Sequence, residues 1–165
     1  MAISRRTFIS GCALTFLSAN VGHAAVDLDD PALPVLKVMR GGAPLASFSR
    51  MDLAAMPQTA FETKTPWNDG PTSYEGPLLA DFLAHVGANA TQLRLLALND
   101  YLVLADVALL VDGGAILAIK EDGDFLPTAR KGPVFMMFPF DSDRRLHSQQ
   151  FYSRAVWQLI EIDLQ

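Results

Sequence analysis

The stretch T-P-W-N-D-G-P-T-S-Y-E-G-P-L, residues 65–78, contains three prolines, two glycines and two large aromatic side chains. Proline fixes φ and glycine accepts conformations closed to other residues, so this composition predicts bends. The preceding residues 59–64 alternate and are rich in β-formers, which predicts a strand. Pro77 suits a helix start, and apolar residues at helical spacing continue to Val86, where Gly87 ends the helix. The stretch therefore predicts a crossing from strand to helix, and it raises the question whether it also lines a binding site.

The remaining segments predict more strands than helices. Two apolar runs around Gly41-Gly42 predict a hairpin, and Ser49 with Asp52 forms a variant capping box for a short helix that Pro57 ends. Because the helices are short and interspersed, we expect an α+β, β-dominated single domain over residues 25–165. The second half predicts a hairpin over 93–104, a helix over 106–112, an acidic turn over 121–124, and strands over 115–120, 134–138 and 156–162.

The first 24 residues have the order of an export signal. Arg5-Arg6 precede a short apolar run, and Gly22-His23-Ala24 offers a cleavage site of small residues. The pattern S-R-R-T-F-I resembles the twin-arginine signal, so we expect a periplasmic protein with no membrane span after cleavage. Two other interpretations stay open, namely a general secretory signal and a lipoprotein signal with Cys12 acylated.

Charge and cysteine content exclude several classes of function. Removing a segment with two arginines and no acidic residue changes the formal net charge from −5 to −7. An acidic domain without a basic stripe argues against nucleic acid or anionic lipid as a partner. Cys12 is the only cysteine, so the mature chain has no disulfide, no thiol nucleophile and no thiolate metal ligand.

The standard catalytic and phosphate-binding motifs are missing from the sequence. His85, on a predicted helix, and His147, in the polar loop 141–150, are both interpreted as surface residues. The acidic turns 122–124 and 141–143 could offer oxygen ligands to a hard cation, but neither continues into a calcium-loop spacing. We therefore interpret both turns as solvated.

A set of polar and aromatic residues falls at predicted strand ends and loops. An arginine fork can hold a phosphate or carboxylate, and tryptophan offers a flat stacking face, so these residues predict a pocket for an anion or a planar ring. The alternative is that Trp67 and Trp157 belong to the core and that the basic residues pair with surplus acids. The predicted pocket draws on Lys64, Thr65, Trp67 and Asn68, on Asn99, Asp100 and Tyr101, on Arg130 and Lys131, and on Tyr152, Ser153 and Arg154.

Four blocks of the chain resemble a known family. They are T-P-W, D-G and Y-E-G-P-L-L within residues 65–79, A-L-N-D-Y at 97–101, K-G-P-V-F at 131–135 with Pro139, and Y-S-R-A-V-W-Q-L at 152–159. In this order they resemble the short exported members of the molybdopterin-binding oxidoreductase family, which has the sulfite-oxidase fold. The resemblance covers residues 30–165 and implies that fold, with a cofactor cleft whose rim includes the stretch 65–78.

The chain departs from this family where the metal should bind. In catalytic members a cysteine thiolate binds molybdenum, and the resemblance places that position near Thr63–Thr65, where threonine and lysine are not comparable soft ligands. The arginine at the start of the last strand is kept as Arg154, whereas Trp157 replaces a lysine. The cofactor-binding residues that the resemblance and the residue types together imply are Lys64, Thr65, Trp67, Asn99, Tyr101, Lys131, Tyr152 and Arg154, with no catalytic and no metal-ligating residue.

These observations favour an exported domain without molybdenum catalysis that binds a small molecule or a periplasmic or membrane partner protein, in sensing or as an accessory module. A rival hypothesis is a periplasmic oxidoreductase that holds molybdopterin through its dithiolene and phosphate, without a protein thiolate. A third is an interaction domain with no functional cleft.

Overall fold

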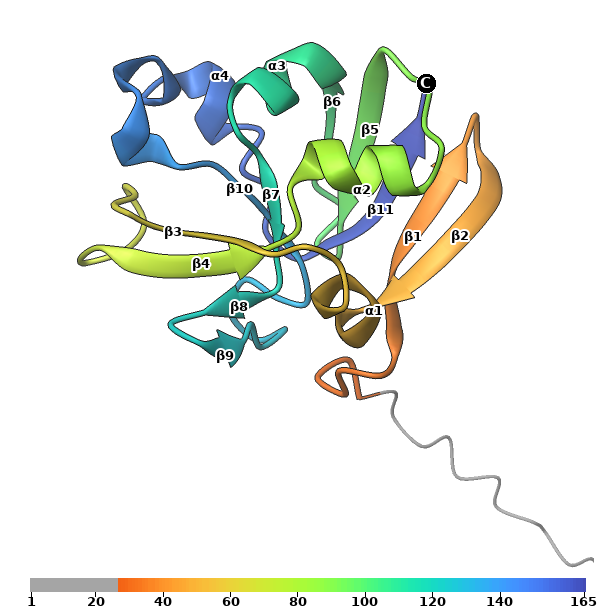
Figure 1. The fold of residues 1–165 in the computed structure, drawn as a ribbon, viewed down its shortest axis with the longest axis horizontal. Coiled ribbons are helices and arrows are strands. Elements are labelled where there is room, and N and C mark those ends of the chain that lie inside the picture. The colour runs from red at the N-terminus through yellow and green to blue at the C-terminus, as the bar shows by residue number, and fades with distance from the viewer. Residues whose placement is uncertain (1–26) are drawn as a thin grey trace, which may run out of the picture.

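The computed structural model describes residues 27–165, and the predicted signal segment lies outside them. Strands dominate, with short helices between them, as expected for a β-dominated α+β fold (Figure 1). In the described part of the chain, no helix has the length and apolar character needed to cross a membrane.

The largest sheet has five strands in the order β2-β1-β11-β5-β6. Strand β1 pairs antiparallel with β2, as the Gly41-Gly42 hairpin predicts, and parallel with β11. Strand β5 pairs antiparallel with β11 and with β6. The last strand thus lies between the first and the fifth, and β2 and β6 form the edges. The bounds are Pro34–Arg40 for β1, Ala43–Ser49 for β2, Gln92–Ala97 for β5, Leu102–Asp106 for β6 and Leu159–Leu164 for β11.

Two smaller sheets adjoin this one. One has the order β3-β4-β8-β9, and the other pairs β7 with β10. Every residue of β7 and β10 is buried, in agreement with the continuous apolar runs in these segments. The bounds are Thr59–Thr63 for β3, Thr72–Gly76 for β4, Ile116–Ala118 for β7, Lys120–Glu121 for β8, Asp124–Phe125 for β9 and Phe135–Met137 for β10.

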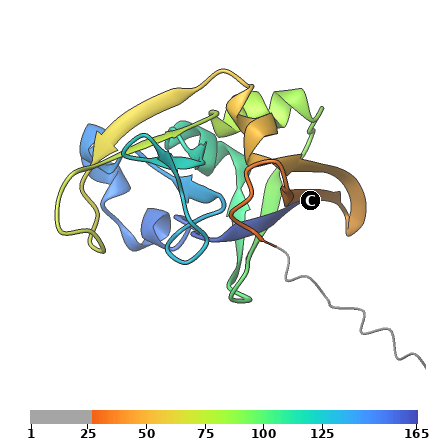
Figure 2. The ribbon, with the colours of Figure 1, turned by 90° about the horizontal axis from the view of Figure 1, so that it is seen from below.

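Helices cover the five-stranded sheet and close the end of the molecule near β10. Helix α2, Leu79–His85, packs on the sheet through Phe82, whose ring centre lies 5.1 Å from that of Phe48 on β2. Helix α3, Val107–Asp112, follows β6 directly. Seen from below, the loop between β3 and β4 lies at the same end of the molecule as α4, Gln149–Tyr152 (Figure 2). Two 3₁₀ turns, η1 at Phe140–Ser142 and η2 at Arg144–Leu146, precede α4.

Four parts of the secondary structure differ from the prediction. The strand predicted over 115–120 divides into β7 and β8, which belong to different sheets. The stretch 65–78 contains strand β4, whose five residues lie between Pro71 and Pro77 and include Gly76, residue types that concealed it. Loop 141–150 contains the 3₁₀ turns and the start of α4, because these one-turn elements are too short to show an apolar period. The last strand begins at Leu159 rather than at Val156, because Gln158 has φ 51° and breaks the extended conformation.

The capping box predicted for α1, Arg50–Ala54, is confirmed. Ser49 Oγ accepts a hydrogen bond from the Asp52 amide at 3.1 Å, and Asp52 Oδ2 accepts one from the Ser49 amide at 2.8 Å. The Ser49 hydroxyl also donates to the same carboxylate at 2.6 Å. These bonds hold the pKa of Asp52 below its ordinary value of 3.8.

We expect Ser49→Ala to lower the free energy of unfolding by about 1 kcal/mol at neutral pH, since it leaves helix donors without their cap. Because the folded pKa of Asp52 is depressed, this stabilisation is present above the unfolded pKa and is lost as the pH falls through the folded value. Urea denaturation at pH 7 and at pH 2.5 should therefore show a difference between the two proteins that shrinks in acid. An unchanged difference would show that the Asp52 carboxylate contributes nothing to the box.

Candidate functional site

A pocket of about 260 Å³ opens where three segments of the chain meet. The β3–β4 loop supplies Trp67, and the β5–β6 turn supplies Asn99 and Tyr101. The end of α4 and its link to β11 supply the rest of the lining, namely Tyr152, Ser153, Ala155, Val156 and Trp157. The lining therefore combines four aromatic side chains with two neutral polar ones.

The Trp67 ring stands nearly at right angles to the rings of Tyr152 and Trp157. The Trp67 ring centre lies 5.9 Å from that of Tyr152, with 82° between the planes, and 6.3 Å from that of Trp157, with 80° between the planes. Tyr101 is held over the pocket because its hydroxyl donates to the carbonyl of Ser153 at 2.8 Å. Edge-to-face packing of this kind fixes the rings in place beyond the burial of their area.

Two backbone conformations bring these segments together. Asp100 has φ 63° in the β5–β6 turn, and Gln158 has φ 51° directly before β11. The amide of Leu98 donates to the carbonyl of Gln158 at 2.9 Å, which ties the turn to the link. Asn99 Oδ1 accepts from the Tyr101 amide at 3.2 Å and so shapes the turn as well. The bend at Gln158, after which β11 begins, therefore also places Trp157 at the pocket.

A chain of polar contacts supports Tyr152 from the side of the 3₁₀ turns. Its hydroxyl lies 3.0 Å from His147 Nδ1, and His147 Nε2 lies 3.8 Å from Asp141 Oδ1. Asp141 Oδ2 accepts from the amide of Lys64 at 2.9 Å, which fixes the end of β3. His147 and Asp141 are exposed, as the sequence indicated, but they also position a pocket residue, which the sequence did not show.

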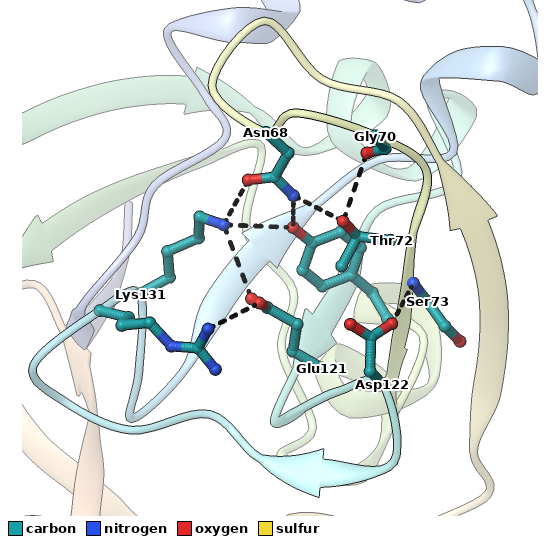
Figure 3. A network of polar contacts seen from close by, with 9 residues as sticks. Asn68, Gly70, Thr72, Ser73, Glu121, Asp122 and Lys131 are labelled. Atoms are coloured by element: carbon teal, nitrogen blue, oxygen red, sulfur yellow. Dashed lines mark hydrogen bonds and ion pairs between the residues drawn. The ribbon is translucent and has the colours of Figure 1, made fainter.

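A partly buried network of polar contacts centres on Asn68, the residue after Trp67 (Figure 3). Lys131 Nζ donates to Asn68 Oδ1 at 2.6 Å and lies 3.6 Å from Glu121 Oε2. Asn68 Nδ2 donates to the hydroxyls of Thr72 and Tyr74, each at 2.8 Å. Burial raises the pKa of Tyr74 to about 12, so its phenol stays neutral at physiological pH. The Lys131 ammonium is thus bound to Asn68 and Glu121 and does not line the pocket.

Arg154 also lies outside the pocket. Its guanidinium donates to the carbonyl of Gln150 at 2.9 Å, to the hydroxyl of Ser153 at 3.1 Å and to the carbonyl of Leu104 at 3.5 Å. Leu104 belongs to β6, which is an edge strand of the sheet. These contacts show that Arg154 ties α4 to that edge.

The structure brings together four of the eight residues implied as cofactor-binding: Trp67, Asn99, Tyr101 and Tyr152 line one pocket. The other four do not line it, because the Lys64 side chain is exposed, Thr65 is buried, and Lys131 and Arg154 bind other groups. The sequence offered Trp157 only as a core residue, whereas its side chain is 41% exposed at the pocket. The replacement of a lysine by Trp157 in the family pattern was the signal that could have identified it.

Comparisons with known proteins identify a similar fold. No family model matches the chain, and no curated protein matches it. The solved structure of the sulfane dehydrogenase SoxCD from Paracoccus pantotrophus superposes with a TM-score of 0.60 at 15% sequence identity. The similarity is one of fold. It covers 86% of this chain but only 39% of that chain, so the match spans well under half of the sulfane dehydrogenase chain.

The residues at the expected metal position do not fit a molybdenum thiolate site. Thr63 is fully buried, and its hydroxyl accepts from the amide of Asp141 at 3.0 Å. Thr65 is 8% exposed, and the side chain of Lys64 faces solvent. Within residues 27–165, no group of three or more His, Cys, Asp or Glu side chains is placed to hold a metal ion. Hydroxyls and an ammonium do not replace the soft ligand of this metal.

Proposed function

We propose that this chain is an exported, non-catalytic binding module with the sulfite-oxidase type of fold, and that its aromatic pocket holds a small organic molecule for a sensory or accessory role. The observation that carries the proposal is the pocket itself. Rings from three separate segments converge on it, and hydrogen bonds hold two of them in place.

The charges around the pocket favour a binding module for a small molecule over an oxidoreductase that holds molybdopterin. A cofactor phosphate would need free cations, but Lys131 is bound to Asn68 and Glu121, and Arg154 donates to main-chain carbonyls and a hydroxyl. The mature sequence also lacks a cysteine to ligate the metal. The rival oxidoreductase would have to displace both cations from these partners.

The size and lining of the pocket suit a small ligand. Its volume of about 260 Å³ lies just below the range of roughly 300–1,000 Å³ typical of sites for drug-sized molecules. Asn99 and Ser153 offer neutral polar groups that can orient a ligand, while the four rings supply apolar contact. A small, mostly apolar molecule with few polar groups matches this site.

The test is native mass spectrometry with metal analysis on protein expressed with its own signal segment and collected from the periplasm. We expect a bound organic mass without stoichiometric molybdenum or pterin. Stoichiometric pterin or molybdenum would overturn the proposal and favour the oxidoreductase. Protein without any bound mass, before and after exposure to a periplasmic metabolite extract, would favour the interaction domain without a cleft.

We expect Trp157→Ala to lose the bound mass, because it removes a wall of the pocket. The side chain is already 41% exposed, so the free energy of unfolding should fall by only about 1 kcal/mol. Leu104→Ala is the matched control, since Leu104 is 51% exposed on β6 and does not line the pocket. If both variants retain the ligand equally, the ligand binds elsewhere.

A further inference from the structure

The rings of the pocket form an open box. Trp67 stands edge to face against both Tyr152 and Trp157, and Tyr101 lines the same pocket. The faces of aromatic rings carry negative potential, and a cation within about 6 Å of a ring centre is attracted to it, most strongly by tryptophan. Four such rings around one pocket make a site that favours a positive charge.

The lining contains no ionised side chain of either sign. A cation entering it therefore meets no like charge on the wall, and an anion meets no cation. The Lys131 ammonium next to Asn68 lies 3.6 Å from the Glu121 carboxylate, which offsets its charge, and the Arg154 guanidinium keeps its charge but donates to two carbonyls and does not line the pocket. The whole chain carries a net charge of −5, which raises the local concentration of cations around it.

The neutral polar groups of the pocket restrict the kind of cation. A primary ammonium is strongly hydrated and needs acceptors for three N–H donors. The side-chain acceptors among the lining residues are few, and Asn99 Oδ1 and the Tyr152 hydroxyl already have partners. A quaternary ammonium carries no N–H group, and its methyl groups pack directly on ring faces.

We propose that the pocket binds a small organic cation with a methylated quaternary nitrogen. This inference rests on the proposed function, because it names the ligand class of the same pocket. Trp67, Tyr152 and Trp157 would surround the methylated nitrogen, while Asn99 and Ser153 lie near enough on the lining to meet a polar tail.

The test is a titration of the full mature protein with choline chloride, in which binding is measured by tryptophan fluorescence and by calorimetry. The protein has only two tryptophans, Trp67 and Trp157, and both line the pocket, so the signal reports on this site. The matched probe is 3,3-dimethyl-1-butanol, which has the shape of choline with carbon in place of the charged nitrogen. We expect choline to bind at least about tenfold more tightly than this alcohol. Sodium chloride serves as the ionic-strength control.

Two variants separate the charge effect from apolar contact. Trp157→Leu keeps apolar surface but removes a ring face, and should weaken choline about tenfold while changing the affinity for the alcohol little. Leu104→Ala, a change on β6 outside the pocket, should retain choline binding and serves as the control. Equal binding of both probes overturns the cation inference and leaves the proposed function standing. If neither probe binds, the cation inference also falls, and the native mass spectrum alone decides whether the proposed function falls with it.

Discussion

Replacing Lys131 by methionine is expected to lower the free energy of unfolding by about 3–5 kcal/mol. The Glu121 side chain is 9% exposed, and its Oε2 atom makes no hydrogen bond among the described residues, so the Lys131 ammonium at 3.6 Å is its main compensation. The change also removes the 2.6 Å hydrogen bond to Asn68 Oδ1. A buried carboxylate without its cation costs far more than a lost surface ion pair.

Arg130 also contacts Glu121 and therefore reduces the loss of stability expected for Lys131→Met toward the lower end of its range. Its Nη1 atom lies 3.6 Å from Glu121 Oε1, but the side chain is 62% exposed and so compensates only weakly. The loss is measured by urea denaturation followed by circular dichroism. The double variant Lys131→Met with Glu121→Gln should recover much of it, because no buried charge is then left unpaired. Simple additivity of the two single changes would contradict the buried-pair explanation.

Gly76→Ala is expected to cost about 3 kcal/mol or more, and to prevent folding if the domain has little stability in reserve. A Cβ atom at this position would lie 2.0 Å from the carbonyl oxygen of Leu117 and 2.8 Å from the Cα of Ala118. These are backbone atoms of β7, so no side-chain rotation can relieve the clash. On either side of Gly76, the amides of Leu117 and Ile119 bond to the carbonyls of Pro77 and Glu75, each at 2.9 Å.

Gly70 provides a matched control in the same stretch. A Cβ atom there meets nothing within 4 Å, and its φ is not in the left-handed region, so Gly70→Ala should change stability by less than about 1 kcal/mol. Thermal unfolding of both variants beside the parent protein checks the pair. Similar losses for the two glycines would show that backbone entropy, and not the approach of β7, limits substitution here.

Local signals predicted most of the framework. The Gly41-Gly42 turn, the capping box at Ser49 and the buried run at 134–138 each carry their structure within a few neighbouring residues. Strand β4 was missed because its short T-S-Y-E-G sequence forms a strand through pairing with β3 and β8, partners that lie on either side in space. Strand β4 therefore depends on tertiary contacts, and its own sequence does not predict it.

The candidate site was predicted in part for the same reason. Trp67, Asn99, Tyr101 and Tyr152 were selected as residues at strand ends, and the topology brings those ends together. The sequence predicts Lys131 and Arg154 at the pocket, but a long side chain binds to whichever partner group the fold brings within its reach. Their partners, Glu121 for Lys131 and the carbonyl of Leu104 for Arg154, lie in other parts of the sequence. The folded structure therefore determines the partner of each flexible cationic side chain.

The position of β11 determines when the five-stranded sheet can form during synthesis of the chain. The ribosome makes this strand after all the other described strands, yet β11 fills the gap between β1 and β5. Residues 37–40 must wait for their parallel partners at 161–164, so the five-stranded sheet cannot close on a nascent chain that still lacks its last strand. Long-range pairing of this kind slows folding. The hairpin of β1 and β2 pairs residues that are close in sequence and can form earlier, whereas the sheet is completed only after residues 159–164 have left the ribosome.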